Sequence, residues 1–294
     1  MLTIDAFLEY LSSELNRSQK TVENYRDDLE RFEKFAESAS DDFSWGTVDA
    51  ELVRAWVEDM LDNGNKSATV SRRLSALRSF YRFALIRKYV EVDPVFRIKS
   101  PKRERPLPQF LKESEMNELL DEKMWSSNYK DVSARTIIML FYETGIRVSE
   151  LVNLNVSHIN LINGEIKVTG KGNKQRIVPL GSEMKDALLK YVKLKDSQAK
   201  VISDALFCSD KGKRISVEQV RRIVQKNLAR VSSLKKKSPH VLRHTFATAM
   251  LNHEAGIESV KKLLGHAKLS TTEIYTHTTF EQLKRVYNEA HPRA

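Results

Sequence analysis

The sequence predicts a mainly α-helical protein of two domains, with a small antiparallel sheet in the second domain. Its 294 residues suit two domains of ordinary size. Apolar residues recur at helical spacing over most of the chain, and strand-like patterns are confined to residues 159–178. A basic, proline-containing stretch separates the two parts. We therefore expect a helical domain at residues 1–92, a linker at residues 93–110 and an α+β domain at residues 111–294.

The first domain is predicted to consist of helices that each carry one apolar face. In the first helix, apolar residues recur at steps of three and four at Val22, Tyr25, Leu29, Phe32 and Phe35. The second helix follows the candidate N-cap Asp49 and has a similar stripe at Leu52, Val53, Trp56, Val57 and Met60. A third helix begins at Ser67 and is expected to turn inward Leu74, Leu77, Phe80, Tyr81, Ala84 and Leu85. The remaining positions of that helix are rich in arginine, so one helix pairs an apolar face with a basic face.

The basic charge of the chain is localised. The 49 Lys and Arg exceed the 39 Asp and Glu by 10. Residues 1–65 hold 6 basic and 16 acidic side chains, residues 66–100 hold 9 and 2, and residues 101–294 hold 34 and 21. Such an excess is typical of proteins that bind a phosphate backbone, although a solvated basic surface gives the same counts. The basic helix face favours DNA as the partner.

Residues 93–110 are predicted to form a stiff basic linker. Helical periodicity fails there, and four prolines stand among five Lys and Arg. Proline favours extended backbone, so the segment suits a path along DNA phosphates. The candidate DNA contacts on the arginine-rich helix and on the linker are Arg72, Arg73, Arg78, Lys102, Arg103 and Arg105.

The second domain is predicted to hold a three-stranded antiparallel sheet among helices. Short strand-like runs at residues 159–161, 166–168 and 177–178 are separated by Asn163-Gly164 and by Lys171-Gly172-Asn173, which are hairpin turn signals. Helical patterns cover residues 114–122, 133–143, 183–196, 217–229, 239–251 and 257–264.

Composition excludes several classes of protein. Cys208 is the single cysteine, so neither an intramolecular disulfide nor a cysteine metal cluster can form, and a reducing compartment is expected. The N-terminus has Asp5 and Glu9 where a secretory signal needs a basic start, and no stretch is apolar enough to span a membrane. His240 and His244 have a metal-ligand spacing, but no third ligand is evident. We expect a cytoplasmic protein that binds no metal and no membrane.

Several polar residues stand at the ends of predicted elements, where side chains are presented rather than buried. They are Arg147 and Glu150, Lys171 in a turn, His240 and Arg243, His266 after Leu264-Gly265, and Tyr275 before Thr276-His277. Together, two arginines, a lysine, two histidines and a tyrosine could bind an anion and transfer protons. No single one of these residues is diagnostic.

In these motifs the sequence resembles the tyrosine site-specific recombinases, and among them the Xer recombinases and related bacterial integrases. The resemblance rests on the order and spacing of His240-x-x-Arg243-His244, Leu264-Gly265-His266, Ser270-Thr271-Thr272 and Tyr275-Thr276-His277. It covers nearly the whole chain. It implies a SAM-like, core-binding N-terminal domain, a catalytic C-terminal domain, and a cytoplasmic protein associated with the bacterial nucleoid.

The resemblance implies a role for each matching residue. Tyr275 would attack a DNA phosphodiester, forming a 3′-phosphotyrosyl bond and freeing a 5′-hydroxyl. Arg147 and Arg243 would stabilise the charge on the non-bridging oxygens through paired hydrogen bonds. Lys171 would protonate the leaving oxygen, and His240 would exchange the proton of the nucleophile or donate to a phosphate oxygen.

Two further residues complete this implied site. His266 would donate another hydrogen bond to the phosphate, and Glu150 would orient Arg147 or His240. Because the phosphotyrosyl bond conserves the energy of the phosphodiester, rejoining is expected to need no ATP, metal or other cofactor.

The resemblance also implies partners. The chain would act on double-stranded DNA sites as a homotetramer, or as a heterotetramer with a related recombinase, through a Holliday junction. In the Xer group a DNA translocase activates the reaction. Phe280, Leu283, Val286 and Tyr287 predict an apolar stripe on a C-terminal helix, and the resemblance implies that this tail docks into a neighbouring protomer. Packing on its own domain is the alternative.

Other functions stay open on the sequence alone. One is a non-catalytic DNA-binding protein of the same fold, and another is a type IB-like topoisomerase that cuts and reseals one strand. The motifs also do not separate an Xer enzyme that resolves chromosome or plasmid dimers from the integrase of a mobile element.

Overall fold

The computed structural model describes residues 2–102, 109–197, 203–265 and 277–293, with Lys171 and residues 277–282 described by their backbone alone. The chain divides into two compact units, Met1–Pro106 and Leu107–Ala294. Each unit has its own apolar core. Among the described helices, none combines the length and the apolar character that crossing a bilayer requires.

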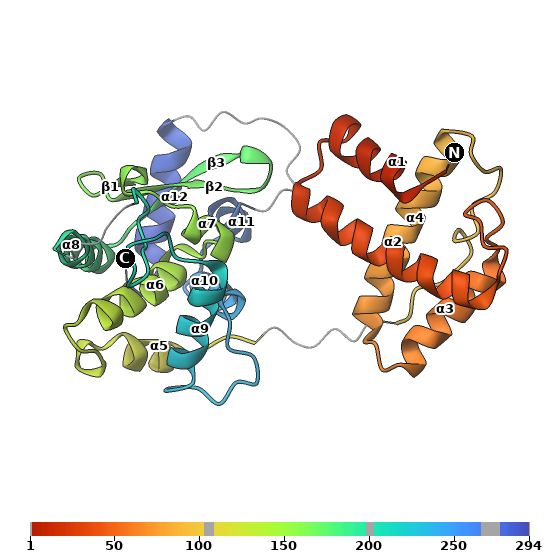
Figure 1. Cartoon of the computed structure of the whole chain (residues 1–294). Helices are drawn as coiled ribbons and strands as arrows, with labels where there is room; N and C mark the ends of the chain where they lie inside the picture. Colours follow the sequence, from red (N-terminus) through yellow and green to blue (C-terminus); the bar gives the residue numbers. More distant parts are fainter. Residues whose placement is uncertain (1, 103–108, 198–202, 266–276, 294) are drawn as a thin grey trace. The chain divides into compact units, whose positions relative to one another are not determined.

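Unit 1 is helical, as predicted (Figure 1). Its elements are α1 (Ile4–Glu9), continued by a π-helical turn at Tyr10–Glu14, then α2 (Gln19–Ala39), α3 (Ala50–Asp62) and α4 (Ser67–Ile86). Helix α2 crosses α4, and α3 packs against both. The predicted N-cap Asp49 is confirmed, because its carboxylate accepts the backbone N–H of Leu52 at 2.8 Å.

Aromatic side chains fill the core of unit 1. The ring of Trp45 lies between those of Phe32 and Phe80, with centroid distances of 5.5 and 4.4 Å. Leu85 departs from the prediction, because its side chain is exposed while that of its neighbour Ala84 is buried. Phe83 is buried instead.

The segment after α4 packs on unit 1. Val95 and Ile98 are buried in its core. Arg78 of α4 donates to the carbonyl of Ile98 at 2.5 Å and to Ser100 Oγ at 3.1 Å. The first part of the stretch predicted as linker is therefore held against the helical unit.

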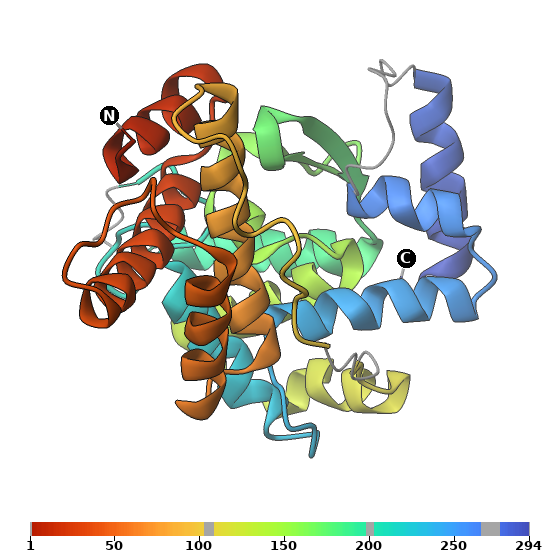
Figure 2. The same ribbon diagram turned by 90° about the vertical axis from the view of Figure 1, so that its right-hand side faces the viewer.

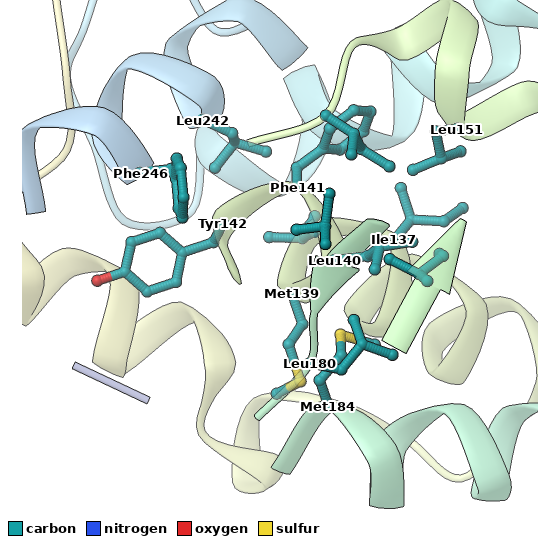
Figure 3. Close-up of a cluster of buried hydrophobic side chains, with 14 of the residues drawn as sticks. Ile137, Met139, Leu140, Phe141, Tyr142, Leu151, Leu180, Met184, Leu242 and Phe246 are labelled. Carbon is teal, nitrogen blue, oxygen red and sulfur yellow. The ribbon is translucent and has the colours of Figure 1, made fainter. Parts of the chain in front are cut away.

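Unit 2 is built around one interior helix. Its helices are α5 (Glu113–Leu120), α6 (Tyr129–Thr144), α7 (Val148–Val152), α8 (Ser182–Asp196), α9 (Val217–Leu228), α10 (Pro239–Asn252), α11 (Ile257–Leu264) and α12 (His277–Ala290). The side chains from Ile137 to Tyr142 are all fully buried, as expected for a helix that is packed on all sides. Figure 3 shows α6 packed between Leu242 and Phe246 of α10 and the pair Leu180 and Met184.

A small antiparallel sheet lies at one edge of unit 2, as predicted. Strands β1 (Ile159–Asn160), β2 (Glu165–Thr169) and β3 (Gln175–Pro179) are paired in the order β1-β2-β3. In β3, Arg176 and Val178 face inward while Ile177 is exposed. The β2–β3 turn contains Lys171 and projects from the body of the unit (Figure 1).

The C-terminal helix α12 packs against its own unit, on β3, α10 and α11 (Figure 2). Leu283 and Tyr287 are buried, and Val286 lies against the same core. The hydroxyl of Tyr287 donates to Glu143 Oε2 at 3.3 Å. These three residues of the predicted stripe pack on the chain's own domain, and docking of the tail into a neighbouring protomer stays a prediction. The side chain of Phe280 lies outside the described residues.

Candidate active site

Two helices that end in left-handed glycines frame the site. Helix α6 ends at Gly145 (φ +58°) and α11 ends at Gly265 (φ +64°). A Cβ on Gly145 would lie 2.4 Å from Phe246 Cδ1, and a Cβ on Gly265 would lie 3.0 Å from Arg176 Nη1. The left-handed backbone favours glycine at both positions, and at Gly145 the neighbouring side chains also leave no room for a Cβ. A predicted site residue follows each glycine within two positions.

Arg147 and Glu150 are joined at the start of α7. Arg147 is the N-cap of this helix, and Glu150 Oε2 accepts its backbone N–H at 2.8 Å. Glu150 Oε1 accepts from Arg147 Nη1 at 2.8 Å, and Nη2 donates to the carbonyl of Gly265 at 3.2 Å. The side chain of Glu150 is 2% exposed and that of Arg147 is 33% exposed. The carboxylate thus fixes Arg147 and leaves part of its guanidinium accessible.

A second arginine binds the same carboxylate. Arg176 Nη1 and Nη2 donate to the two oxygens of Glu150 at 3.0 and 2.9 Å, in a bidentate pair. Its Nε donates to the carbonyl of Leu263 at 2.8 Å. Because Arg176 belongs to β3, this pair links the hairpin to α7 and α11.

Arg243 is buried on α10 and reaches both helix ends. Its Nη1 donates to the carbonyl of Gly145 at 2.6 Å, and its Nη2 donates to the carbonyl of Leu264 at 2.8 Å. Three consecutive carbonyls at the end of α11, those of Leu263, Leu264 and Gly265, therefore accept from three guanidiniums. A helix C-terminus leaves such carbonyls unpaired and carries a partial negative charge, which attracts cations.

The site carries excess positive charge. Burial alone would raise the pKa of Glu150, but the hydrogen bonds and charges of Arg176 and Arg147 outweigh it, so the pKa is lowered and the carboxylate stays ionised. Burial, and then the charge of Arg147, lower the pKa of Arg243 to about 10. Three guanidiniums thus share one carboxylate, which makes the surroundings suitable for an anion.

His240 lies one turn before Arg243 on α10 and is exposed. Partial desolvation, followed by the positive charges of Arg243 and other basic neighbours, lowers the pKa of its imidazole. The ring is therefore neutral at pH 7 and can accept a proton. Within the described residues, Glu150 hydrogen-bonds to Arg147 and Arg176, and no bond joins it to His240.

The remaining predicted site residues are placed only by the chain around them. The backbone of Lys171 lies in the β2–β3 turn, directly after Gly170. His266 directly follows Gly265, and Tyr275 lies between that glycine and α12; both fall outside the described residues. Across the described ranges, no three His, Cys, Asp or Glu side chains are grouped as a metal ion would require.

Comparison with known proteins identifies the family. Residues 109–282 match the Phage integrase family, and residues 4–88 match the domain described as Phage integrase, N-terminal SAM-like domain. The chain belongs to the phage integrase family. It is 40% identical over 301 residues to Tyrosine recombinase XerC of Pelotomaculum thermopropionicum, covering 99% of this chain and 98% of that relative.

Two further comparisons agree with this family and with the fold. Tyrosine recombinase XerD of Staphylococcus saprophyticus is 36% identical over 298 residues, covering 99% of both chains. A lambda integrase tetramer bound to a Holliday junction shares the fold with a TM-score of 0.70 at 20% identity, covering 92% of this chain and 78% of that one. The predicted family and the predicted two-part, mainly helical fold are confirmed.

The predicted DNA contacts of this integrase-family chain are not equivalent in the structure. Arg72 forms an ion pair with the buried Asp28 and keeps half of its side chain exposed. Arg73 is only 14% exposed, lies 3.9 Å from Asp28 and donates to Asn65, so most of its guanidinium faces the protein. Arg78 holds the segment after α4, as described above. Lys102 is exposed, and Arg103 and Arg105 lie outside the described residues.

Sequence reasoning missed Arg176. The sequence does contain an indication of its role, because Arg176 stands two residues before the buried Val178 and therefore on the same, inward face of the strand. A charged side chain on the buried face of a strand needs a buried partner. The pattern did not say that the partner would be Glu150, because the two residues lie 26 positions apart and meet only in the fold.

Proposed function

We propose that this chain is a site-specific recombinase that cuts and rejoins double-stranded DNA through Tyr275. The observation that carries the proposal is the meeting of Arg147, Arg176 and Arg243 at the end of α11, immediately before His266. A phosphodiester that reaches this point would find paired donors from Arg147 and Arg243. These donors would bind most strongly to the charge that grows on the non-bridging oxygens in the transition state.

The proposed reaction is a balanced exchange of one phosphodiester for another. The hydroxyl oxygen of Tyr275 bonds to phosphorus, and the bond from phosphorus to the 5′-oxygen breaks. The tyrosine proton passes to the neutral His240, and Lys171 gives a proton to the leaving oxygen. A 5′-hydroxyl from the partner strand then attacks the 3′-phosphotyrosyl group and releases the tyrosine. No electron is transferred, and no ATP or metal ion enters the balance.

We further propose an Xer-like assembly on DNA. Support comes from the named relatives, which include both XerC and XerD, and from the lambda integrase tetramer on a Holliday junction. Four subunits, identical or shared with a related recombinase, would bring two sites together, and a DNA translocase could supply activation. Such an enzyme would act in the bacterial cytoplasm, at the nucleoid. A mobile-element integrase would use the same residues.

A covalent trapping experiment tests the proposal. The protein is incubated with nicked duplexes that carry a randomised central segment, because loss of the short 5′ product traps the covalent intermediate. We expect an adduct that survives denaturation and maps to Tyr275, and the recovered DNA defines the site. Tyr275→Phe should bind that site with unchanged affinity and form no adduct, because it loses only one hydroxyl.

Two outcomes would contradict the proposal. An adduct of full yield from Tyr275→Phe would remove this residue from the mechanism, and complete absence of adducts would favour a non-catalytic DNA-binding protein. Two intact copies of the recovered site distinguish a recombinase, which exchanges strands between them, from a topoisomerase, which reseals each duplex separately.

A further inference from the structure

We infer that Arg176 is a positioning residue that aligns the two halves of the catalytic site, the arginine that binds phosphate and the lysine-bearing turn. The inference deepens the proposed function and rests on it. Arg176 itself is 7% exposed and would not touch DNA. It would act through the residues that it contacts.

The first link runs through Glu150 to Arg147. Glu150 uses both oxygens twice: each accepts one nitrogen of Arg176, and each accepts one nitrogen of Arg147 at 2.8 Å. Without Arg176, the carboxylate would be anchored only by the backbone N–H of Arg147 and by the same guanidinium that it has to position. With the bidentate partner in place, the carboxylate plane is fixed, and with it the direction of the Arg147 guanidinium.

The second link reaches the turn that carries Lys171. A Cβ on Gly170 would lie 3.1 Å from Glu150 Oε1 and 3.7 Å from Arg176 Nη1, so the backbone just before Lys171 rests on this ion pair. The N–H of Gly170 donates to the carbonyl of Lys174 at 2.8 Å and closes the turn. Movement of Arg176 would therefore move the base of the turn.

The third link reaches the end of α11. Arg176 Nε donates to the carbonyl of Leu263. A Cβ on Gly265 would lie 3.0 Å from Nη1 and 3.2 Å from Cζ of Arg176, so the guanidinium passes close to this glycine. Gly265 is followed directly by His266. One buried side chain thus lies close to the residue before each of two predicted catalytic residues and binds the carboxylate that holds a third.

Burial makes this arrangement sensitive to substitution. Both partners of the pair are almost fully buried, with side-chain exposures of 6% for Arg176 and 2% for Glu150. Removing Arg176 takes away two of the four hydrogen bonds of the buried Glu150 carboxylate, which would then turn toward Arg147 alone. Lysine at this position would keep the charge but could not form the three planar hydrogen bonds of the guanidinium.

The test compares Arg176→Met and Arg176→Lys with Arg214→Met. Arg214 is a matched control, since it also donates to backbone carbonyls and to a carboxylate of unit 2, but none of its partners adjoins a predicted catalytic residue. Covalent adduct formation is timed in single turnover on the nicked duplex recovered by trapping. The same duplex is then used with sulfur in place of the 5′-bridging oxygen, because a thiolate leaves without a proton from Lys171.

We expect Arg176→Met to cleave normal DNA about 100-fold more slowly, the loss typical of misplaced groups. On the sulfur-bridged DNA we expect a loss at least about tenfold smaller, because displacement of Lys171 no longer matters there. Arg176→Lys should show the same pattern to a lesser degree. DNA affinity should match that of Arg214→Met, which should cleave both DNAs at the wild-type rate.

A wild-type rate for Arg176→Met on normal DNA would overturn the inference, as would an equal loss on both DNAs. If Arg176→Met does not fold, Arg176→Lys decides by the same comparison, because it retains the buried charge. Failure of the proposed function looks different: the wild-type protein itself would then form no adduct on either DNA.

Discussion

Arg243 shows how one side chain can serve both the fold and the chemistry. Its two terminal nitrogens join the end of α6 to the end of α11, through carbonyls at 2.6 and 2.8 Å. The same guanidinium is buried beside Arg147, so under the proposed function it would meet a phosphate with little competing water. Desolvated, fixed donors stabilise developing charge better than mobile surface donors. The residue predicted to bind phosphate is thus already oriented without DNA.

The proposed role of Lys171 as general acid can be tested by removing its side chain. If it is the general acid, Lys171→Ala should cleave normal DNA at least about 100-fold more slowly and recover most of that rate on DNA with a 5′-bridging sulfur. Single-turnover cleavage of both substrates measures this, with wild-type protein as the reference. Equal losses on the two substrates would instead assign Lys171 to binding or to phosphate stabilisation.

The helix ends are the elements that build the site. Gly145 ends α6 and Gly265 ends α11, and the left-handed turns direct the chain toward Arg147 and His266. The hairpin of β2 and β3 adds Lys171 at its turn and Arg176 on its inner face. Each element contributes one or two functional groups from a terminus, where backbone donors and acceptors are also available.

Substitution of a helix-ending glycine tests this role. Gly145→Ala adds a methyl group 2.4 Å from Phe246 and forces alanine into a left-handed conformation, so we expect a loss of about 2–4 kcal/mol in the free energy of unfolding. Gly64→Ala is the matched control, because Gly64 has φ +73° and no atom within 4 Å of the added Cβ. In denaturant unfolding, Gly64→Ala should lose only about 1 kcal/mol in the free energy of unfolding, less than Gly145→Ala. Equal losses would contradict steric crowding at Gly145.

The contact between α6 and α12 predicts a pH dependence. Burial raises the pKa of Glu143 to about 8 from an ordinary value of 4.5. The folded chain therefore holds a proton that the unfolded chain releases, and stability falls as pH rises from about 5 to about 8. Glutamine at position 143 does not titrate. The unfolding temperature of Glu143→Gln, relative to that of the wild type, should therefore rise as the pH rises over this range. Glu118→Gln, on the exposed face of α5, should show no such gain; a constant difference for Glu143→Gln would contradict the assignment.

At the scale of the whole molecule, most of the fold could be predicted from local pattern. The strands of unit 2 were predictable because apolar alternation and hairpin turns are local signals, and the helices were predictable from their stripes. The packing of α12 on its own unit could not be predicted, because an amphipathic pattern shows which face is apolar but not which surface covers it. Arg176 was not predicted either, since its partner Glu150 is distant in sequence. Tyr275 and His266 remain predictions from their motifs.

The proposed DNA contacts come from both units. Unit 1 presents Arg72 and Lys102 with exposed side chains, and unit 2 carries the group of arginines at the end of α11. Phosphate contacts from both units would make binding steeply dependent on salt. Specific cleavage, by contrast, would depend on the alignment of Arg147, Lys171 and Tyr275 around one phosphate.

We propose that this alignment exchanges DNA strands by transesterification, and strand exchange between two duplexes is its direct test. Two duplexes of different length, each with the site recovered by trapping, are incubated with wild-type protein in EDTA and without ATP. We expect recombinant duplexes of two new lengths, none with Tyr275→Phe, and a protein-bound 3′ end during the reaction. Absence of recombinants where adducts form, or their appearance only with added metal ion or ATP, would contradict it.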